Sequence, residues 1–204
     1  SPDINLGVKG GTNAQQVSKI MEKFELVIIR ENPQAVLVVG DVNSTLACSM
    51  VSAYRGIKVI HVEAGLRSFD LSMPEEINRM LTDKISDLLF VTEKSAKTNL
   101  EREGIDPEKI QFVGNVMADT LLKNKELASS SSTILTNLNL KPQQYSFLTL
   151  HRPSNVDKKE ILQGIMEAIN KLSREIAVVF PIHPRTKNNI YKFKLDHFLN
   201  GLIL

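Results

Sequence analysis

Apolar positions follow two alternating spacings along this chain. In residues 14–30 they recur at helical spacing, whereas residues 35–40 form a short unbroken apolar run, which is typical of a strand buried on both faces. Further strands are predicted at residues 58–63, 87–92 and 109–114, and further helices at residues 45–55, 75–86 and 94–104. Helices and strands that alternate with short connections imply βαβ crossovers, and therefore an α/β fold with a parallel sheet.

The alternation weakens after residue 115 and resumes at residue 145. A helix is predicted for residues 116–127, and the serine-rich residues 128–133 follow it. Beyond them, strands are predicted at residues 145–151, 175–183 and 201–204, with helices at residues 157–175 and 186–198. We expect an N-terminal Rossmann-like domain over residues 1–116, a helix and linker over residues 117–144, and a second Rossmann-like domain over residues 145–204, both domains incomplete.

Composition narrows the class of protein. The chain has 204 residues, 42% of them hydrophobic, and a net charge of +2, which is ordinary for a globular protein. The sequence contains no basic run with interleaved aromatic residues, which a nucleic-acid-binding surface would more often show. No apolar run approaches the ~20 residues that span a bilayer. Cys48 is the single cysteine, so it is predicted to be structural and fits a cytoplasmic protein. Among the histidines, which lack metal-ligand spacing, His61 is predicted in the core and His197 on the surface.

Three acidic residues stand at or just beyond the ends of predicted strands. Asp41 follows the first strand, Glu63 ends the second, and Glu75 opens the next helix. Ligands of open parallel sheets bind at the carboxyl ends of the strands, and an unpaired carboxylate buried there would be costly. Several acids in one crevice therefore predict a site that moves protons. The alternative for Asp41 is a simple turn into a helix that Ser44 or Thr45 caps.

Two arginines accompany these acids. Arg67 offers a planar donor fork that suits phosphate or carboxylate, and the alternative is a surface pair with Glu63. Glu75 and Arg79 stand four residues apart on one predicted helical face, with Glu76 pointing elsewhere. The alternative for this second pair is an ordinary helical salt bridge.

The second half of the chain repeats one arrangement at two strand ends. His151 ends the first predicted strand of this half and Arg152 follows it, while His183 ends the second and Arg185 follows shortly after. Histidine and arginine side chains are the fixed donors that bind phosphate, so these four residues predict an anion-binding rim.

Five segments carry most of these residues in a fixed order: GDVNSTLA (40–47), HVEAGLRS (61–68), MPEEINR (73–79), FVGNVMADTLL (112–122) and TLHRPSNVD (149–157). Together they resemble the UDP-N-acetylglucosamine 2-epimerase family, in particular its non-hydrolysing bacterial type, over about residues 11–185. The resemblance implies two Rossmann-like domains of the glycosyltransferase-B-like type and a nucleotide-sugar substrate. It implies that UDP-GlcNAc and UDP-ManNAc are interconverted by elimination of UDP to 2-acetamidoglucal and its re-addition, without a cofactor.

The resemblance also assigns roles to residues. Asp41, Glu63 and Glu75 match the family's acid/base residues, and His151 matches the catalytic histidine that contacts the substrate diphosphate. The candidate substrate-binding residues are Arg67, Arg79, Asn115, Arg152, His183 and Arg185. Which carboxylate takes the C2 proton stays open, with Asp41 as our hypothesis. The family further implies a homodimer for the full-length protein and a role in surface-polysaccharide synthesis.

Other functions share the same motifs. A hydrolysing relative would release ManNAc, another relative would act on a modified UDP-sugar, and a nucleotide-sugar-binding module would perform no catalysis. An intact set of acids argues against the last of these. The family's first strand with its phosphate loop, and its uridine-binding segment, are expected outside these residues, so the isolated segment is expected to be inactive.

Overall fold

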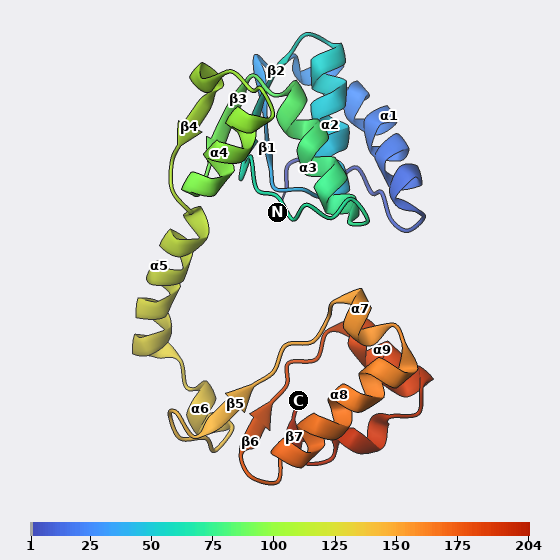
Figure 1. Cartoon of the computed structure of the whole chain (residues 1–204), viewed down its shortest axis with the longest axis vertical. Helices are drawn as coiled ribbons and strands as arrows, with labels where there is room; N and C mark the ends of the chain where they lie inside the picture. The colour runs from blue at the N-terminus through green and yellow to red at the C-terminus, as the bar shows by residue number, and fades with distance from the viewer. Residues whose placement is uncertain (1) are drawn as a thin grey trace. The chain divides into compact units, whose positions relative to one another are not determined.

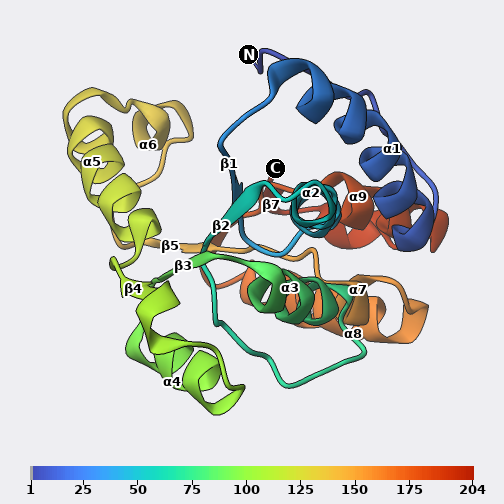
Figure 2. The ribbon, with the colours of Figure 1, turned by 90° about the horizontal axis from the view of Figure 1, so that it is seen from above.

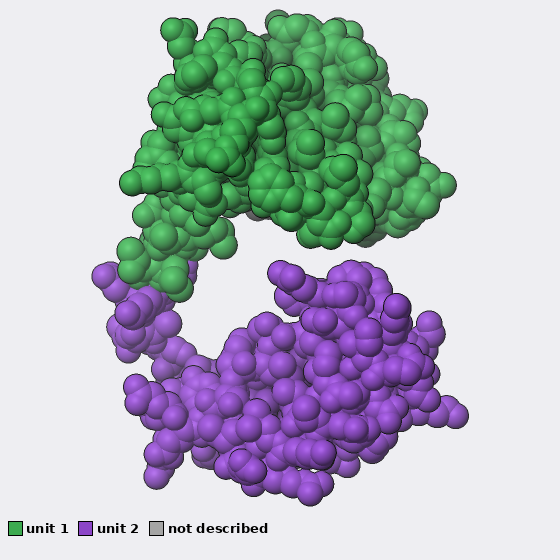
Figure 3. All heavy atoms as spheres, viewed as in Figure 1, with its two compact units in different colours: residues 1–123 green, residues 124–204 purple. Residues whose placement is uncertain are grey.

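A computed structural model describes residues 2–204 of the chain. It divides into two compact units, Ser1–Lys123 and Asn124–Leu204, which are coloured separately in Figure 3. The division falls inside helix α5 (Val116–Ser131), within the stretch for which a helix and linker were expected. Each unit holds a parallel sheet, which confirms the predicted α/β fold class.

The described part of unit 1 contains a four-stranded sheet in the order β1-β2-β3-β4 (Figure 1), and all of its pairings are parallel. Its strands are β1 (Ala35–Val39), β2 (Lys58–Val62), β3 (Leu88–Val91) and β4 (Ile110–Phe112). Its helices are α1 (Asn13–Glu31), α2 (Asn43–Tyr54), α3 (Pro74–Ile85), α4 (Lys94–Arg102) and the short η1 (Pro107–Lys109). Helices α1, α2 and α3 pack side by side (Figures 1 and 2).

Helix α1 shows why these elements form where the pattern predicts them. Thr12 and Gln15 make a reciprocal capping box at its start, and Ile20 and Ile28 form its buried side. Asn32 ends it in the left-handed conformation at φ 44°, directly before Pro33. The predicted helix over residues 14–30 is therefore confirmed.

Strand β1 differs from its prediction. It was expected to be buried on both faces, but Leu37 is 56% and Val39 52% exposed. The reason is that β1 forms the edge of the described sheet, with β2 as its neighbour on one side.

The predicted cap of helix α2, Ser44 or Thr45, is also wrong, because the N-cap is Val42, which makes no side-chain hydrogen bond. Thr45 Oγ1 instead donates back to the Val39 carbonyl at 2.8 Å.

Unit 2 contains a second parallel sheet in the order β5-β6-β7 within its described residues. Its strands are β5 (Tyr145–Phe147), β6 (Ala177–Val179) and β7 (Leu202–Ile203), and its helices are α6 (Ile134–Asn137), α7 (Pro153–Val156), α8 (Lys159–Leu172), α9 (Pro184–Lys192) and η2 (Asp196–Leu199). Its core gathers around Leu162, Met166 and Phe180, each fully buried. The strands are shorter than predicted, and their ends continue as irregular chain toward the helices that follow.

Two further differences from the predicted elements concern a serine run, which was expected to follow the helix over residues 116–127, and a proline. Ser129, Ser130 and Ser131 belong to α5, where each hydroxyl donates to a carbonyl three or four residues earlier, at 2.7–3.0 Å. Such bonds satisfy serine inside a helix, so a serine run need not be a loop. Pro153 lies between the predicted strand over residues 145–151 and the predicted helix over residues 157–175, and it occupies the first turn of α7, where its missing N–H costs nothing.

Within residues 2–204, no helix combines the length and the apolar composition that crossing a membrane requires.

Candidate active site

The ends of β1 and β2 bring two of the predicted acids together. The two strands pair in register up to Val39 and Val62, and the Gly40 N–H donates to the Val62 carbonyl at 3.0 Å. Glu63 therefore lies beside Gly40, and its Oε2 would be 3.4 Å from a Cβ placed on that glycine. Because Asp41 follows Gly40 directly, the two acids occupy neighbouring strand ends.

Glu63 has an uncommon backbone and a free side chain. Its φ of 68° is left-handed, which costs a residue with a side chain roughly 1–2 kcal/mol. The side chain is half-buried, and its carboxylate makes no hydrogen bond or ion pair with any other residue in 2–204. Strained backbones concentrate at functional sites, and an unpaired carboxylate can exchange a proton without first breaking an ion pair.

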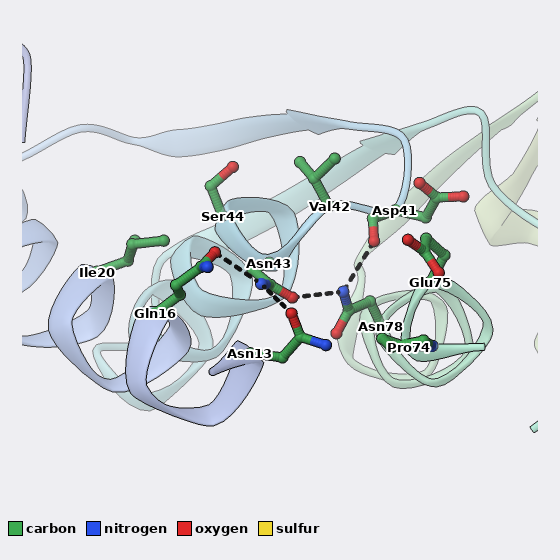
Figure 4. A pocket seen from close by; sticks show the side chains of 10 residues that line it. All are labelled: Asn13, Gln16, Ile20, Asp41, Val42, Asn43, Ser44, Pro74, Glu75 and Asn78. Atoms are coloured by element: carbon green, nitrogen blue, oxygen red, sulfur yellow. Dashed lines mark hydrogen bonds between the residues drawn. The ribbon is translucent and has the colours of Figure 1, made fainter. Parts of the chain in front are cut away.

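Asp41 and Glu75 line one pocket of about 270 Å³ at the N-terminal ends of α1, α2 and α3 (Figure 4). Asp41 comes from the turn between β1 and α2, and Glu75 from the first turn of α3, behind Pro74. The Glu75 side chain is exposed and makes no hydrogen bond or ion pair with another residue in the described part of the chain. Three helix N-termini give this pocket a positive dipole field that favours a negatively charged or oxygen-rich ligand.

A chain of amide side chains forms the floor of the pocket (Figure 4). Asn43 Nδ2 donates to Asn13 Oδ1 at 3.1 Å and to Gln16 Oε1 at 3.0 Å. Asn78 Nδ2 donates to Asn43 Oδ1 at 3.1 Å and to the Asp41 carbonyl at 2.9 Å. These bonds tie α1, α2 and α3 together and fix the backbone of Asp41. These amides carry no motif of their own, so the sequence alone does not reveal them.

Arg79 pairs with other acids than the sequence predicted. Its Nη1 lies 2.5 Å from Glu76 Oε2, and its Nη2 donates to Asp41 Oδ2. Glu76, expected to point away, is only 1% exposed, whereas Glu75 stays without a partner in residues 2–204. The alternative of an ordinary helical salt bridge between Glu75 and Arg79 is therefore wrong. Arg79 turns instead to the acid three residues before it and to the end of β1.

Glu76, which the helical spacing predicted to point away from Arg79, is a buried acid. Its two oxygens accept the backbone N–H groups of Ser68 and Phe69, each at 3.0 Å, which pins the loop after β2. Burial disfavours the charged carboxylate, but these two N–H groups and Arg79 outweigh it and hold the pKa of Glu76 below its usual 4.5.

The lowered pKa of Glu76 predicts how the stability of the protein depends on pH. The contribution of Glu76 is complete above pH 4.5, the unfolded value, and is lost as the pH falls through the lower folded pKa. Glu76→Gln is expected to reduce the free energy of unfolding by roughly 3 kcal/mol at pH 7, with a gap that narrows below pH 4.5. Urea unfolding over this pH range measures the gap, and Glu75→Gln on the same helix is the control. A gap as wide at pH 3 as at pH 7 would contradict the prediction.

Arg67 does not present its donor fork to a ligand. Its Nε and Nη2 each lie 2.7 Å from the Glu103 carboxylate, and its Nη1 lies 2.7 Å from Asp83 Oδ2. The side chain is 1% exposed, and although burial alone would lower the pKa of Arg67, Glu103 and Asp83 raise it. The structure thus replaces both the expected anion-binding role and the alternative pair with Glu63 by an internal bridge between α3 and the end of α4.

His61 confirms its prediction as a core residue. It is fully buried, with Nδ1 2.7 Å from Asp83 Oδ1 and Nε2 2.8 Å from the Gly40 carbonyl. Both ring nitrogens therefore have a hydrogen-bonding partner inside the fold. Asp83 also accepts the Gly65 N–H at 3.1 Å. One carboxylate of α3 therefore contacts the His61 ring before Glu63 and the Gly65 N–H after it.

The histidines predicted at the strand ends of unit 2 lie together. The rings of His151 and His183 have centroids 5.7 Å apart, and both residues are exposed. Arg152 is exposed beside them and makes no side-chain bond with another residue in 2–204. Arg185 instead pairs with Asp157, which raises the pKa of Arg185, and its Nε lies 2.8 Å from Asp157 Oδ1. This pair is exposed, and exposed ion pairs contribute little to stability, so an anion can displace it.

The remaining candidates have structural positions. Asn115 Oδ1 accepts the Met117 N–H at 2.9 Å and so orders the start of α5. Burial raises the pKa of Cys48 to about 11, in line with its prediction as a structural residue. Within residues 2–204, no three histidine, cysteine or acidic side chains are arranged to hold a metal ion.

Comparison with known proteins gives consistent matches. The family model described as UDP-N-acetylglucosamine 2-epimerase matches residues 1–203. The chain is 42% identical over 204 residues to a UDP-N-acetylglucosamine 2-epimerase of Methanococcus maripaludis, covering 98% of this chain and 56% of the relative. It is 41% identical over 197 residues to a UDP-2,3-diacetamido-2,3-dideoxy-D-glucuronate 2-epimerase of Pseudomonas aeruginosa, covering 95% of this chain and 54% of the relative.

A solved structure agrees with these matches. The crystal structure of Methanocaldococcus jannaschii UDP-GlcNAc 2-epimerase in complex with UDP-GlcNAc and UDP has a TM-score of 0.89 and 43% identity, and the match covers 100% of this chain and 57% of that one. The chain thus spans about half the length of the relatives it matches.

Proposed function

The chain belongs to the UDP-N-acetylglucosamine 2-epimerase family, and on that premise we propose that the whole protein inverts C2 of UDP-N-acetylglucosamine. The product is UDP-N-acetylmannosamine, and the reaction proceeds by elimination of UDP to 2-acetamidoglucal and re-addition of UDP. Elimination and addition move no net electrons, so the proposal includes no redox cofactor.

One observation carries the proposal: acids from three separate elements gather around one sheet end. Asp41 and Glu75 line the same pocket, and the Glu63 carboxylate lies against Gly40, the residue before Asp41. The C2 proton is poorly acidic, so its removal needs a base close at hand, and inversion needs a second group to return a proton to the opposite face. Several acids in one place meet that requirement.

We assign the C2 base to Asp41 and the opposing acid to Glu63. Asp41 lines the pocket and its carboxylate contacts Arg79, whereas Glu63 stands at the neighbouring strand end with no partner among residues 2–204. Two separate carboxylates are what removal and return of a proton on opposite faces require. Glu75, exposed at the pocket, is the third proton-transfer group of the proposal.

We assign the leaving diphosphate to the anion-binding rim of unit 2. His151 and His183 lie together there, and Arg152 is exposed beside them. Donors of this kind stabilise the charge that develops on a departing phosphate. Arg185 joins them in the proposal once it leaves its exposed pair with Asp157.

The assignment of Asp41 is tested by solvent exchange. When the full-length Asp41→Asn protein is incubated with UDP-GlcNAc in heavy water, we expect no deuterium to appear at C2 of the sugar. Binding of the UDP-sugar, measured by calorimetry, should be retained. The exposed Asp119→Asn on α5 is the matched control and should exchange at the wild-type rate. Exchange that persists in the Asp41 variant would move the base to another residue.

A modified UDP-sugar is the second candidate substrate. The Pseudomonas aeruginosa relative, whose name specifies a diacetamido uronate, is nearly as similar to this chain as the Methanococcus maripaludis relative. Product analysis by NMR with both UDP-sugars distinguishes the two substrates. The same spectra separate release of free ManNAc from formation of UDP-ManNAc.

A further inference from the structure

We propose that Glu76 and Arg79 are positioning residues that together aim the Asp41 carboxylate into the pocket, and that Arg79 does not bind the substrate diphosphate. The inference rests on the proposed function, because it gives Asp41 a reacting partner in the pocket. It concerns one cation that two acids share.

Arg79 is already committed on both sides. Its two terminal nitrogens contact different carboxylates, Glu76 through Nη1 and Asp41 through Nη2. Only 12% of its side chain is exposed. A diphosphate that took this guanidinium would leave the buried Glu76 carboxylate without its cation, which is costly. Arg79 is therefore better placed to hold Asp41 than to receive a ligand.

Glu76 fixes the other end of this arrangement. Backbone N–H groups of Ser68 and Phe69 occupy its two oxygens, and Arg79 approaches Oε2 from the same helix. These three donors set the orientation of the carboxylate, and the carboxylate in turn sets the orientation of the guanidinium. The Asp41 backbone is held separately by Asn78, so its side-chain rotamer is what Arg79 determines.

Other charged groups near Glu76 do not compete for this role. Arg67 and Glu103 line a small hollow together with Glu76, and they pair with each other at 2.7 Å. Like Glu76, Glu103 is a glutamate of unit 1 that pairs with a largely buried arginine, but it makes no bond to Asp41 or to its partner Arg79. Glu103→Gln is therefore the matched control for Glu76→Gln.

The test compares kcat and KM in the full-length protein with UDP-GlcNAc. We expect Glu76→Gln and Arg79→Met each to lower kcat on the order of 100-fold, the cost of a misplaced reacting group, with KM within threefold of wild type. The double variant should be no slower than Arg79→Met alone, because the two residues act through one contact. Glu103→Gln should keep kcat within about twofold.

Two outcomes would overturn the inference. One is an Arg79→Met variant that raises KM tenfold at unchanged kcat, as expected of a lost substrate ligand. The other is a crystal structure of Glu76→Gln in which Arg79 and Asp41 keep their wild-type contact, a result that is independent of turnover. Failure of the proposed function would look different, since the wild-type protein itself would leave UDP-GlcNAc unchanged.

Discussion

Glu63→Gln is expected to reduce epimerisation of UDP-GlcNAc by the full-length protein about 100- to 10,000-fold, the range attributed to a positioned proton-transfer group. Glutamine has nearly the same shape but can neither give nor take the proton. Glu63 keeps a left-handed backbone, and its half-buried carboxylate has no partner in residues 2–204. Stability therefore gives no reason for a carboxylate at this position, whereas proton transfer does.

The same variant should leave stability almost unchanged, which separates chemistry from folding. No bond of the carboxylate is lost, and the side chain keeps its volume, so the change in unfolding free energy should stay within about 0.5 kcal/mol. Glu22→Gln, at an exposed position of α1, is the control for both measurements. Epimerisation above a tenth of the wild-type rate in the Glu63 variant would remove this residue from the proposed mechanism.

The order of helices and strands can be predicted from the sequence, because each element depends on a local pattern of apolar residues. The helical and strand periodicities predicted the order of the elements. Because the strands pair in parallel, Asp41 and Glu63 then had to lie at the same end of the sheet, where the strands reach their carboxyl ends. His61 was predictable for the same reason, since it alternates along β2 and reaches the core.

The sequence does not predict which charges pair, because that choice is made across the fold. Arg67 finds Glu103, 36 residues away, and Arg79 finds Asp41, 38 residues away. Each arginine has an acidic residue four positions away in the sequence, Glu63 for Arg67 and Glu75 for Arg79. Its actual partner depends instead on how the helices pack against the strand ends. The exposure of β1 could not be predicted from the sequence either, because a short apolar run has the same sequence pattern in a central strand and in an edge strand.

Helix α3 explains how the strand ends are held. Its buried acids face different segments: Glu76 binds the loop after β2, and Asp83 binds His61 and the Gly65 N–H. In both cases a carboxylate satisfies backbone N–H groups that the end of the sheet leaves unpaired. The loop that follows Glu63 is therefore shaped by α3 and by the close packing of Gly65.

Gly65→Ala is expected to be the most destabilising substitution of a single glycine in unit 1. The residue has a φ of 78°, and an added Cβ would lie 2.5 Å from the Ala96 carbonyl oxygen and 2.9 Å from Leu100 Cγ. The left-handed backbone costs an alanine ~1–2 kcal/mol, and forcing atoms into a packed site adds ~1–3 kcal/mol. The expected loss of unfolding free energy is therefore about 2–5 kcal/mol.

Gly104→Ala separates the two contributions. Gly104 has nearly the same φ, 74°, but an added Cβ would meet no atom within 4 Å, so only the backbone cost of ~1–2 kcal/mol applies. Urea unfolding of both variants measures the difference. Because Gly65 lies two residues after Glu63, its displacement should also lower epimerisation, whereas Gly104→Ala should retain the wild-type rate. Equal losses of stability in the two variants would mean that α4 moves aside freely, and the close packing of Gly65 could then not be what fixes Glu63.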